Sequence, residues 1–428
     1  MSTALIGARL IVGDGTVIDG ATVEFEDGRI TSVRATRNAG SSPARAGLVI
    51  DLEGRTLLPG LIDAHTHMVG GDNAIGHGDE ATTFKMSDPL IRAVLDSVEA
   101  ARVTLNAGIT TVRDIGCRDF IDVYMRAAQA AGQIESPRIV ATGPGMAITG
   151  GHGNHWQPDR TADGIVEVVK RVRELVHHKV DVIKVVSGDG PETLGTWTAV
   201  QSSPEEIAAA FAEARRLGRM TTAHAMGGEA IRNVAAAGGD TVEHGWYLDE
   251  ESCHALIGQG TYLVPTLGNV IAIIHNGPGL DMPWARMMAA DEAAIFERMQ
   301  MAVELGVKFA MGSDCGGNEA HIHGSNAHEL PLYVRCGMEP MTAIVSGTLE
   351  AARAIRRDHE VGSVEAGKLA DFVILDGDPL ADIDRLVKGV VGVIQGGRVV
   401  RDDLGLLDEL RRTVTSWRRT STAVMPRF

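Results

Sequence analysis

Pro59-Gly60-Leu61-Ile62-Asp63-Ala64-His65-Thr66-His67 is an apolar run that ends in two histidines, and it decides how the rest of the chain is interpreted. Side chains alternate along a β-strand, so His65 and His67 point to the same side. Two imidazoles placed in this way at a strand end can share a metal ion. A second pair of the same spacing, His321-Ile322-His323, is interpreted as part of a loop.

From residue 58 onward, short apolar runs alternate with helical stretches, which is typical of βα units around a parallel sheet. The eight predicted strands are residues 61–67, 109–114, 138–142, 180–186, 220–224, 240–244, 262–266 and 307–314. Helices are predicted between most of them, for example at 89–106, 162–177 and 204–217. The last of these begins with a capping box, because Ser203 stands at the N-cap and Glu206 three residues later. Eight such units predict a TIM barrel with insertions.

The two ends of the chain have a different pattern, with short strands separated by turns. Near the start these strands are predicted at 4–12, 22–26, 30–33 and 48–51, and after a helix at 340–356 they return at 371–375, 390–394 and 398–400. We therefore expect an α/β protein in which a (β/α)8 TIM barrel of residues 58–361 is joined to a small β-sandwich domain built from both chain ends, residues 1–57 and 362–402. The tail, 403–428, carries an amphipathic helix at 406–417, interpreted as a packing or oligomer arm.

Composition and charge narrow the class of protein. The 428 residues carry 40 Lys and Arg against 56 Asp and Glu, a net charge of −16, which disfavours nucleic acid or an anionic membrane as a partner. The four cysteines form no C-x-x-C pair, so neither a cysteine-rich zinc site nor a thioredoxin motif is indicated. With no signal-peptide pattern and no apolar stretch long enough to span a membrane, we expect a cytoplasmic homo-oligomer that acts on a small molecule.

Further polar residues lie at or near the ends of the predicted barrel strands. Lys184 is inside the apolar run 180–186, where a lysine is costly unless it is paired or modified. Three other runs end in His224, His244 and Asp314. In a TIM barrel the C-terminal strand ends converge on the active site, so the combined pattern, rather than any single residue, indicates a functional centre.

Seven motifs carry a resemblance to a known family. They are LLPGLIDAHTHM at 57–68, AGITTVRD at 107–114, TGGHG at 149–153, DVIKVVSGDG at 181–190, TVEHG at 241–245, GSDCG at 312–316 and GSVEAGKLADFVILDGDPL at 362–380. With these motifs the chain resembles the amidohydrolase superfamily, and within it the imidazolonepropionase-like and Xaa-Pro dipeptidase (prolidase-like) branch. The resemblance covers nearly the whole chain, and the last motif corresponds to the family's return to its β-sandwich domain.

The resemblance implies a hydrolase with two divalent metal ions. The implied metal ligands are His65, His67, Lys184, His224, His244 and Asp314. The first two histidines and Asp314 would hold the more buried ion, and the other two histidines the more exposed one. Lys184, carboxylated by carbon dioxide, would bridge both ions, because a carbamate is an anion with two oxygens whereas an ammonium group would repel them. This ligand set suits Zn²⁺, and Mn²⁺ and Co²⁺ fit it as well.

The same resemblance implies a reaction. A metal-bound water can have its pKa lowered to about 7, so hydroxide is available at neutral pH. Asp314 is then the catalytic residue that takes the proton from the hydroxide and delivers it to the leaving amine.

Substrate contacts are expected in the loops that follow the strands. His152, in the TGGHG motif, matches a family position expected to contact the substrate's carbonyl or carboxylate, and His155 is three residues further on. Trp246 would line an apolar subsite after the sixth strand. The loop 316–330, which contains His323, would close over the substrate.

The chain departs from the dipeptidase-like relatives at Met226. Those relatives commonly have a tyrosine there, which helps to hold a free α-carboxylate. A thioether cannot donate a hydrogen bond to a carboxylate. This weakens the dipeptidase assignment and leaves amides, lactams, carbamates or esters without a free carboxylate open.

These observations predict a binuclear metal-dependent amidohydrolase that hydrolyses an amide-type C–N bond in a dipeptide, N-acyl amino acid, lactam or related small molecule. A carbamate or ester hydrolase stays open. A mononuclear deaminase is a further alternative, in which Glu229 would serve as the acid–base residue after His224, although Lys184 argues against it. A non-catalytic scaffold on this fold would be expected to have lost metal ligands, and none is missing here.

Overall fold

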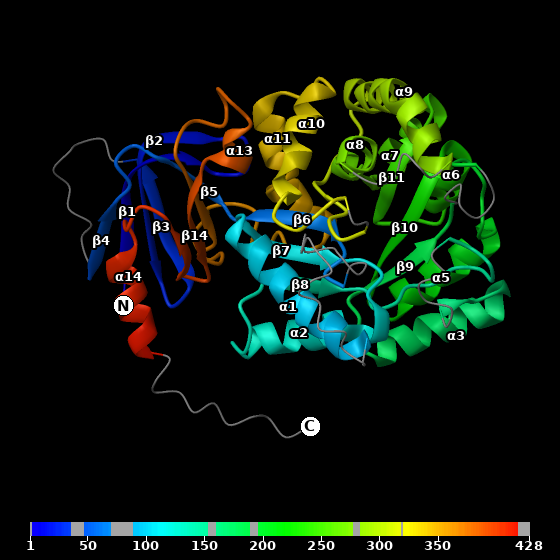
Figure 1. Cartoon of the computed structure of the whole chain (residues 1–428), viewed down its shortest axis with the longest axis horizontal. Helices are drawn as coiled ribbons and strands as arrows, with labels where there is room; N and C mark the ends of the chain where they lie inside the picture. Colours follow the sequence, from blue (N-terminus) through cyan, green and yellow to red (C-terminus); the bar gives the residue numbers. More distant parts are fainter. Residues whose placement is uncertain are drawn as a thin grey trace, which may run out of the picture. The chain divides into compact units, whose positions relative to one another are not determined.

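The computed structural model describes residues 2–35, 47–69, 89–152, 160–188, 196–276, 283–317 and 320–417. The chain divides into two compact units (Figure 1). One combines Met1–Gly60 with Asp358–Phe428, and the other is Leu61–Arg357. Among the residues described, no helix is both long and apolar enough to cross a membrane.

The first unit contains one eight-stranded sheet built from both chain ends. Its strands are β1 (Thr3–Ile11), β2 (Val17–Glu26), β3 (Arg29–Ala35), β4 (Leu48–Asp51), β5 (Thr56–Pro59), β13 (Phe372–Leu375), β14 (Val390–Gln395) and β15 (Arg398–Asp402). They follow the order β15-β14-β13-β5-β1-β2-β3, and β4 pairs with β1. The blue and orange strands of Figure 1 meet where β13 runs antiparallel to β5. Strand pairing thus joins strands from both chain ends in one unit, as we expected.

The tail helix belongs to the core of this unit. The rings of Phe25 and Phe372 lie 5.8 Å apart at the centre of the buried cluster. Leu407 and Leu410, at the start of α14 (Asp408–Trp417), are buried in the same cluster. Burial of these leucines makes this part of the tail a packing element of the sheet unit. The four-residue helix α13 (Arg385–Lys388) lies between β13 and β14.

The second unit is α/β, with two parallel sheets. One sheet has the order β6-β7-β8, with β6 (Leu61–Thr66), β7 (Ile109–Asp114) and β8 (Arg138–Ala141). The other has the order β12-β11-β10-β9, with β9 (Val182–Val186), β10 (Met220–Gly227), β11 (Thr241–Tyr247) and β12 (Tyr262–Val264). In Figure 1 the green strands β9, β10 and β11 lie side by side. Seven of the eight predicted runs therefore form strands.

The eighth predicted strand, 307–314, is not a regular strand. Its first half bridges β12 through Phe309 and Leu263, and its end bridges β6 through Cys315 and Thr66. Asp314 has φ of 62°, a left-handed conformation that interrupts an extended ladder. The segment consequently makes only isolated bridges. On the other side, a bridge between Met146 and Val185 connects the chain after β8 to β9.

Helices alternate with these strands. They are α1 (Pro89–Asn106), α2 (Ile121–Ala130), α3 (Gly164–His177), α5 (Pro204–Arg216), α6 (Gly228–Ala236), α7 (Glu250–Gln259), α8 (Leu267–Asn276), α9 (Pro283–Leu305), α10 (Glu329–Arg335), α11 (Pro340–Ser346) and α12 (Leu349–Ala354), with short 3₁₀ helices at Arg118–Phe120 and Asn326–His328. The capping box predicted for α5 is present, with Ser203 and Glu206 bonded reciprocally. The helix expected at 340–356 is wrong as one element, because the chain leaves the helical conformation at Thr348, between α11 and α12.

Candidate active site

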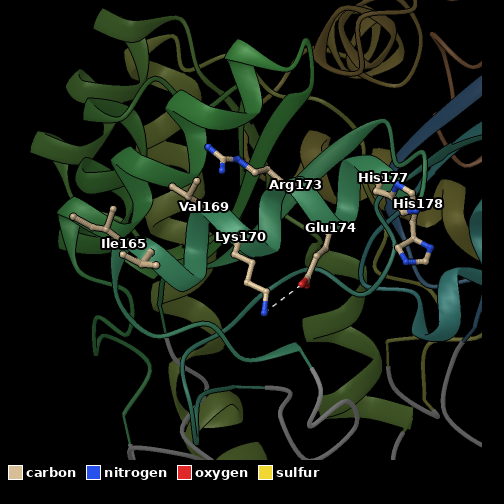
Figure 2. Close-up of a pocket in the computed structure, with 8 residues that line it drawn as sticks. Ile165, Val169, Lys170, Arg173, Glu174, His177 and His178 are labelled. Carbon is tan, nitrogen blue, oxygen red and sulfur yellow. Dashed lines mark ion pairs between the residues drawn. The ribbon is translucent and has the colours of Figure 1, made fainter.

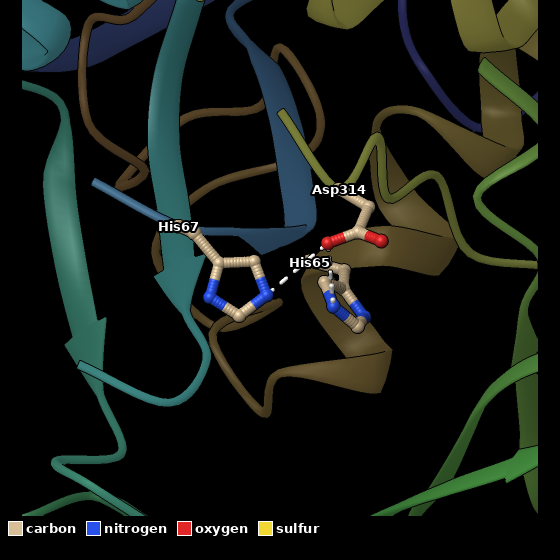
Figure 3. A group of neighbouring side chains, drawn as sticks. All are labelled: His65, His67 and Asp314. Atoms are coloured by element: carbon tan, nitrogen blue, oxygen red, sulfur yellow. Dashed lines mark ion pairs between the residues drawn. The ribbon is translucent and has the colours of Figure 1, made fainter. Parts of the chain in front are cut away.

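His65, on strand β6, and His67, directly after it, face one carboxylate (Figure 3). The Nε2 atom of His67 lies 3.1 Å from Oδ1 of Asp314, and Nε2 of His65 lies 3.4 Å from the same oxygen. One ligand atom from each of the three residues falls within 4.8 Å of the others. Residues separated by almost 250 positions are therefore close enough to share one cation.

Local packing explains why the segment around Asp314 comes so close to β6. A Cβ added to Gly312 would lie 2.7 Å from the Cβ of His65, and one added to Gly316 would lie 2.1 Å from the carbonyl oxygen of His67. Only glycine fits at either position. Asp63 joins the same two segments, because its Oδ1 accepts hydrogen bonds from the backbone N–H groups of His65 and Ser313, both at 3.0 Å.

Beneath this pair, a buried carboxylate orients His65. Oε2 of Glu243 lies 2.7 Å from Nδ1 of His65. The other oxygen of Glu243 accepts a hydrogen bond from Nη2 of Arg113 at 2.7 Å, and both side chains of this ion pair are fully buried. Burial alone would raise the pKa of Glu243, but the Arg113 charge and the His65 hydrogen bond outweigh it and lower the pKa. Glu243 is thus ionised and accepts the Nδ1–H, which leaves Nε2 of His65 facing Asp314.

Two further histidines, from β10 and β11, lie next to this group. The ring centroids of His65 and His244 are 4.9 Å apart, and those of His244 and His224 are 4.5 Å apart. Nδ1 of His244 lies 2.8 Å from the hydroxyl of Thr266, so Nε2 is the nitrogen left for a ligand. Within the described part of the chain, the buried Nε2 of His224 has no hydrogen-bond partner.

Three residues of this group have a strained backbone. His244, Thr266 and Asp314 have φ of 74°, 54° and 62°, in the left-handed region that L-residues rarely occupy. Such conformations cost about 1–3 kcal/mol each and persist where the surrounding structure holds them. The strain therefore favours a functional role for these three residues.

Lys184 approaches from β9. Lys184 pairs with Thr222 of β10, and Thr222 is two positions before His224. The side chain of Lys184 is buried. Burial lowers the pKa of Lys184 to about 8, and Glu243 only partly opposes that effect. Near neutral pH an appreciable share of the amine is uncharged, which is the form that reacts with carbon dioxide.

The protonation states of the candidate ligands favour cation binding. Burial lowers the pKa of His67, His224 and His244, which keeps these imidazoles neutral and able to bind metal. Burial would raise the pKa of Asp314, but His65 and His67 outweigh it, and the pKa falls well below its ordinary value. Burial would lower the pKa of His65, but Asp314 and Glu243 outweigh it and raise the pKa. Three neutral imidazoles with one ionised carboxylate match the ligand preferences of zinc. The unpartnered Nε2 of His224 fits the same interpretation, because buried polar atoms normally have a partner.

Of the residues expected to bind substrate, some lie beside the candidate ligands and others do not. His152 lies against His224, with ring centroids 4.5 Å apart. Trp246 lies against His244 at 5.3 Å, and Met226 is buried on β10. His155 lies outside the residues that the structure describes. His323 has a different position from the one we expected.

His323 and its neighbour His321 are both buried, although they belong to a loop. Nε2 of His323 donates to the carbonyl of His67 at 3.0 Å, and its Nδ1 lies 3.1 Å from the hydroxyl of Thr104. Because both ring nitrogens are engaged, His323 supports the backbone of β6 rather than pointing freely toward a substrate. Glu229, which the deaminase alternative requires, is exposed in the first turn of α6.

Sequence reasoning missed the residues that support the ligands: Asp63, Arg113, Glu243, Thr266 and Asn269. Asn269 donates from Nδ2 to Oδ2 of Asp314 at 2.5 Å, so each oxygen of that carboxylate has a partner. Asp63, Arg113 and Glu243 stand inside the quoted motifs, and a charged residue within an apolar run was the available signal. No local sequence feature indicated a role for Thr266 or Asn269.

Two other features do not belong to the site. A pocket runs along α3 and is lined by residues of that helix and His178 (Figure 2). None of the candidate ligands lines it, and Lys170 and Glu174 form an ion pair of 3.7 Å across it. Asp114, Cys117 and Asp122 form a second buried group, in which Asp122 accepts backbone N–H groups of Thr142 and Gly143. All four cysteines of the chain are buried and free.

The chain is similar to several known proteins. The model of the amidohydrolase family matches residues 56–400. The ochratoxinase of Aspergillus niger is 28% identical over 93% of this chain and 86% of its own length. The imidazolonepropionase of Rhizobium meliloti (strain 1021) is 26% identical over 86% of this chain and 88% of its own. A crystal structure of a Xaa-Pro dipeptidase with bound methionine in the active site superposes with a TM-score of 0.82, at 29% identity over 92% of this chain and 98% of the other.

Fold, site and comparisons together define an enzyme class, the hydrolases that act on carbon–nitrogen bonds. Within that class, this chain belongs to the amidohydrolase family.

Proposed function

We propose that this enzyme is a binuclear metal-dependent amidohydrolase that hydrolyses an amide-type C–N bond in a small molecule. The observation that carries the proposal is the meeting of His65, His67 and Asp314, whose ligand atoms lie within 4.8 Å of one another. The imidazoles of His224 and His244, which lie beside this group, support a second ion. Zn²⁺ is the metal that this set of nitrogen and oxygen ligands favours.

Lys184 is the bridging residue of the proposed centre. A buried ammonium beside two histidine pairs would repel cations, whereas the carbamate formed with carbon dioxide would supply an anion with two oxygens. The buried position on β9, one strand from His224, supports this modification.

A (β/α)8 TIM barrel is the architecture we propose for the second unit. The bridges of segment 307–315 to β12 and β6, and that of Met146 to β9, support a closed ring of strands. The candidate ligands then lie at or near the C-terminal strand ends, where active sites of such barrels are found.

Two divalent cations, when bound, would polarise the substrate carbonyl and make hydroxide available from water near neutral pH. The remaining roles belong to side chains of this chain. Asp314, held by Asn269 on one oxygen, would take up the proton released in the reaction and deliver it to the leaving nitrogen. His152, placed against His224, would bind the substrate carbonyl.

The substrate that we propose is a small amide, such as an N-acyl amino acid, a dipeptide or a lactam. A net charge of −16 supports the absence of a nucleic-acid partner. We further propose that the chain forms a homo-oligomer and acts in the cytoplasm.

Metal depletion tests the proposal directly. We expect two zinc ions per chain by elemental analysis, loss of amide hydrolysis after chelation, and its return when zinc is added. Lys184→Ala should lose activity and the second ion, while Lys170→Ala, a matched change of a lysine exposed on α3, should keep both. Bicarbonate labelled with ¹³C should give a carbamate signal in the wild type that is absent from Lys184→Ala.

The substrates for this test are dipeptides, N-acyl amino acids, lactams, carbamates and esters, assayed in parallel. Full activity in the metal-free enzyme would refute the proposal. One ion per chain together with ammonia release from an aminated heterocycle would replace it with the deaminase alternative.

A further inference from the structure

Aromatic side chains gather at one side of the candidate centre. The ring of Trp197 lies 5.8 Å from that of Trp246, 6.2 Å from Tyr247 and 6.5 Å from Trp284. The chain has only five tryptophans, and aromatic residues are 4% of it. Three of these five tryptophans lie in this one cluster, although aromatic residues are scarce in the chain as a whole. Because Trp246 also packs on His244, the cluster is continuous with the ligand group.

Trp197 is held firmly in this cluster. It lies between β9 and α5, in a segment tied to the end of β9 by a bridge between Gly188 and Val200. A Cβ added to Gly227, at the end of β10, would lie 3.0 Å from the Cα of Thr198, so the segment also packs closely on that strand. The indole is 6% exposed.

The polar atoms of the cluster differ in whether they have a hydrogen-bond partner. Nε1 of Trp246 donates to the carbonyl of Pro265 at 2.6 Å, and the hydroxyl of Tyr247 bonds to Asp291 at 2.7 Å. Nε1 of Trp197 is buried and has no hydrogen-bond partner among the residues that the structure describes. A buried N–H without a partner is costly, and it calls for an explanation such as a bound ligand.

We propose that Trp197 binds the substrate, with its ring against an aromatic group of the substrate and its Nε1–H donating to an acceptor oxygen beside that group. This inference rests on the proposed function, and it narrows the substrate class to amides that carry an aromatic ring. Offset and edge-to-face contacts with Trp197 and Trp246 would favour such a ring over a small aliphatic group. The Nε1–H of Trp197 is also a neutral hydrogen-bond donor, which the thioether of Met226 is not.

Binding to the full-length, zinc-loaded enzyme tests the proposal. N-benzoylglycine and N-acetylglycine share an amide and a carboxylate and differ in the ring, and calorimetry gives their Kd values. We expect the wild type to bind the benzoyl compound at least about 10-fold more tightly. Trp197→Phe, which keeps a ring and removes the N–H, should bind both compounds about 5-fold more weakly. Trp197→Ala should abolish the preference for the ring.

Stability measurements separate a binding role from a structural one. The unfolding temperature of Trp197→Phe should match or exceed that of the wild type, because the lost N–H has no partner among the residues described. Trp246→Phe should unfold at a lower temperature, because it loses the bond to Pro265. Tyr124→Ala, a change at an exposed residue of α2, is the surface control.

Equal affinity of the wild type for the two compounds, or unchanged affinity in Trp197→Phe, would overturn the proposal about Trp197. If the enzyme still holds zinc and hydrolyses amides in that case, the proposed function stands without it. If Trp197→Ala loses the preference for the ring but the enzyme needs no metal for activity, the result would support the aromatic subsite. The same result would refute the binuclear mechanism.

Discussion

Nδ1 of His65 lies 2.7 Å from Oε2 of Glu243, and both side chains are buried. A carboxylate in this position holds the imidazole in one orientation and one tautomer, with Nε2 directed at the cation site. The relationship crosses from β6 to β11, so it ties two strands of the second unit together beneath the candidate ligands. Arg113 completes the arrangement by balancing the charge of Glu243.

Glu243→Gln should weaken metal binding about 10–100-fold, because the amide cannot supply the charge that orients His65. Competition with a chelating dye measures the affinity, and circular dichroism shows whether the variant is folded. Glu251→Gln, at a glutamate with 78% of its side chain exposed, is the matched control. Equal affinities in the two variants would contradict the assigned role.

Asn269→Ala should also weaken metal binding, because Oδ2 of Asp314 loses its donor and the carboxylate can rotate away from His65 and His67. We expect a loss of about 10-fold, at the lower end of the effect of outer-shell changes. The absorption spectrum of the cobalt-substituted enzyme reports the coordination independently of turnover. A variant with the wild-type spectrum and affinity would show that Asn269 does not position Asp314.

Gly312→Ala should disrupt the site, because the added Cβ would lie 2.2 Å from Val264 and 2.7 Å from the Cβ of His65. The segment that carries Asp314 must then move away from β6, and we expect both a lower unfolding temperature and loss of bound zinc. Gly258→Ala in α7 is the control, because nothing lies within 4 Å of its added Cβ. Gly258→Ala should be neutral or stabilise the helix by about 0.4–1 kcal/mol. Normal zinc content in Gly312→Ala would contradict this account.

Glu213 makes stability depend on acid pH. Hydrogen bonds from Arg216 and Arg173 lower the pKa of Glu213 from its ordinary value of 4.5 to about 2. The unfolded chain binds this proton more readily, so the stabilising contribution is complete above about pH 4.5 and is lost as the pH falls toward 2. In urea denaturation, the advantage of the wild type over Glu213→Gln should shrink across this window. A constant difference between the two proteins would contradict the assignment.

Sequence patterns predicted most of the regular structure, because hydrophobic periodicity reports which face of an element is buried. The strands at 61–67 and 109–114 and the helix at 89–106 are examples, and the capping box of α5 was readable from Ser203 and Glu206. Predictions failed where long-range contacts decide the backbone. Asp314 adopts a left-handed conformation inside an apolar run, and Thr348 interrupts a helical pattern without a proline.

By itself, the sequence determined which residue types stand at the strand ends, and hence the ligand candidates, because the alternation of side chains and the order of strands are local properties. Tertiary structure alone decided the supporting partners. Glu243 meets His65 and Asn269 meets Asp314 through contacts between segments far apart in the chain, and Nε1 of Trp197 has no partner among the described residues. Such contacts depend on how strands and loops pack in three dimensions, and no spacing along the chain encodes them.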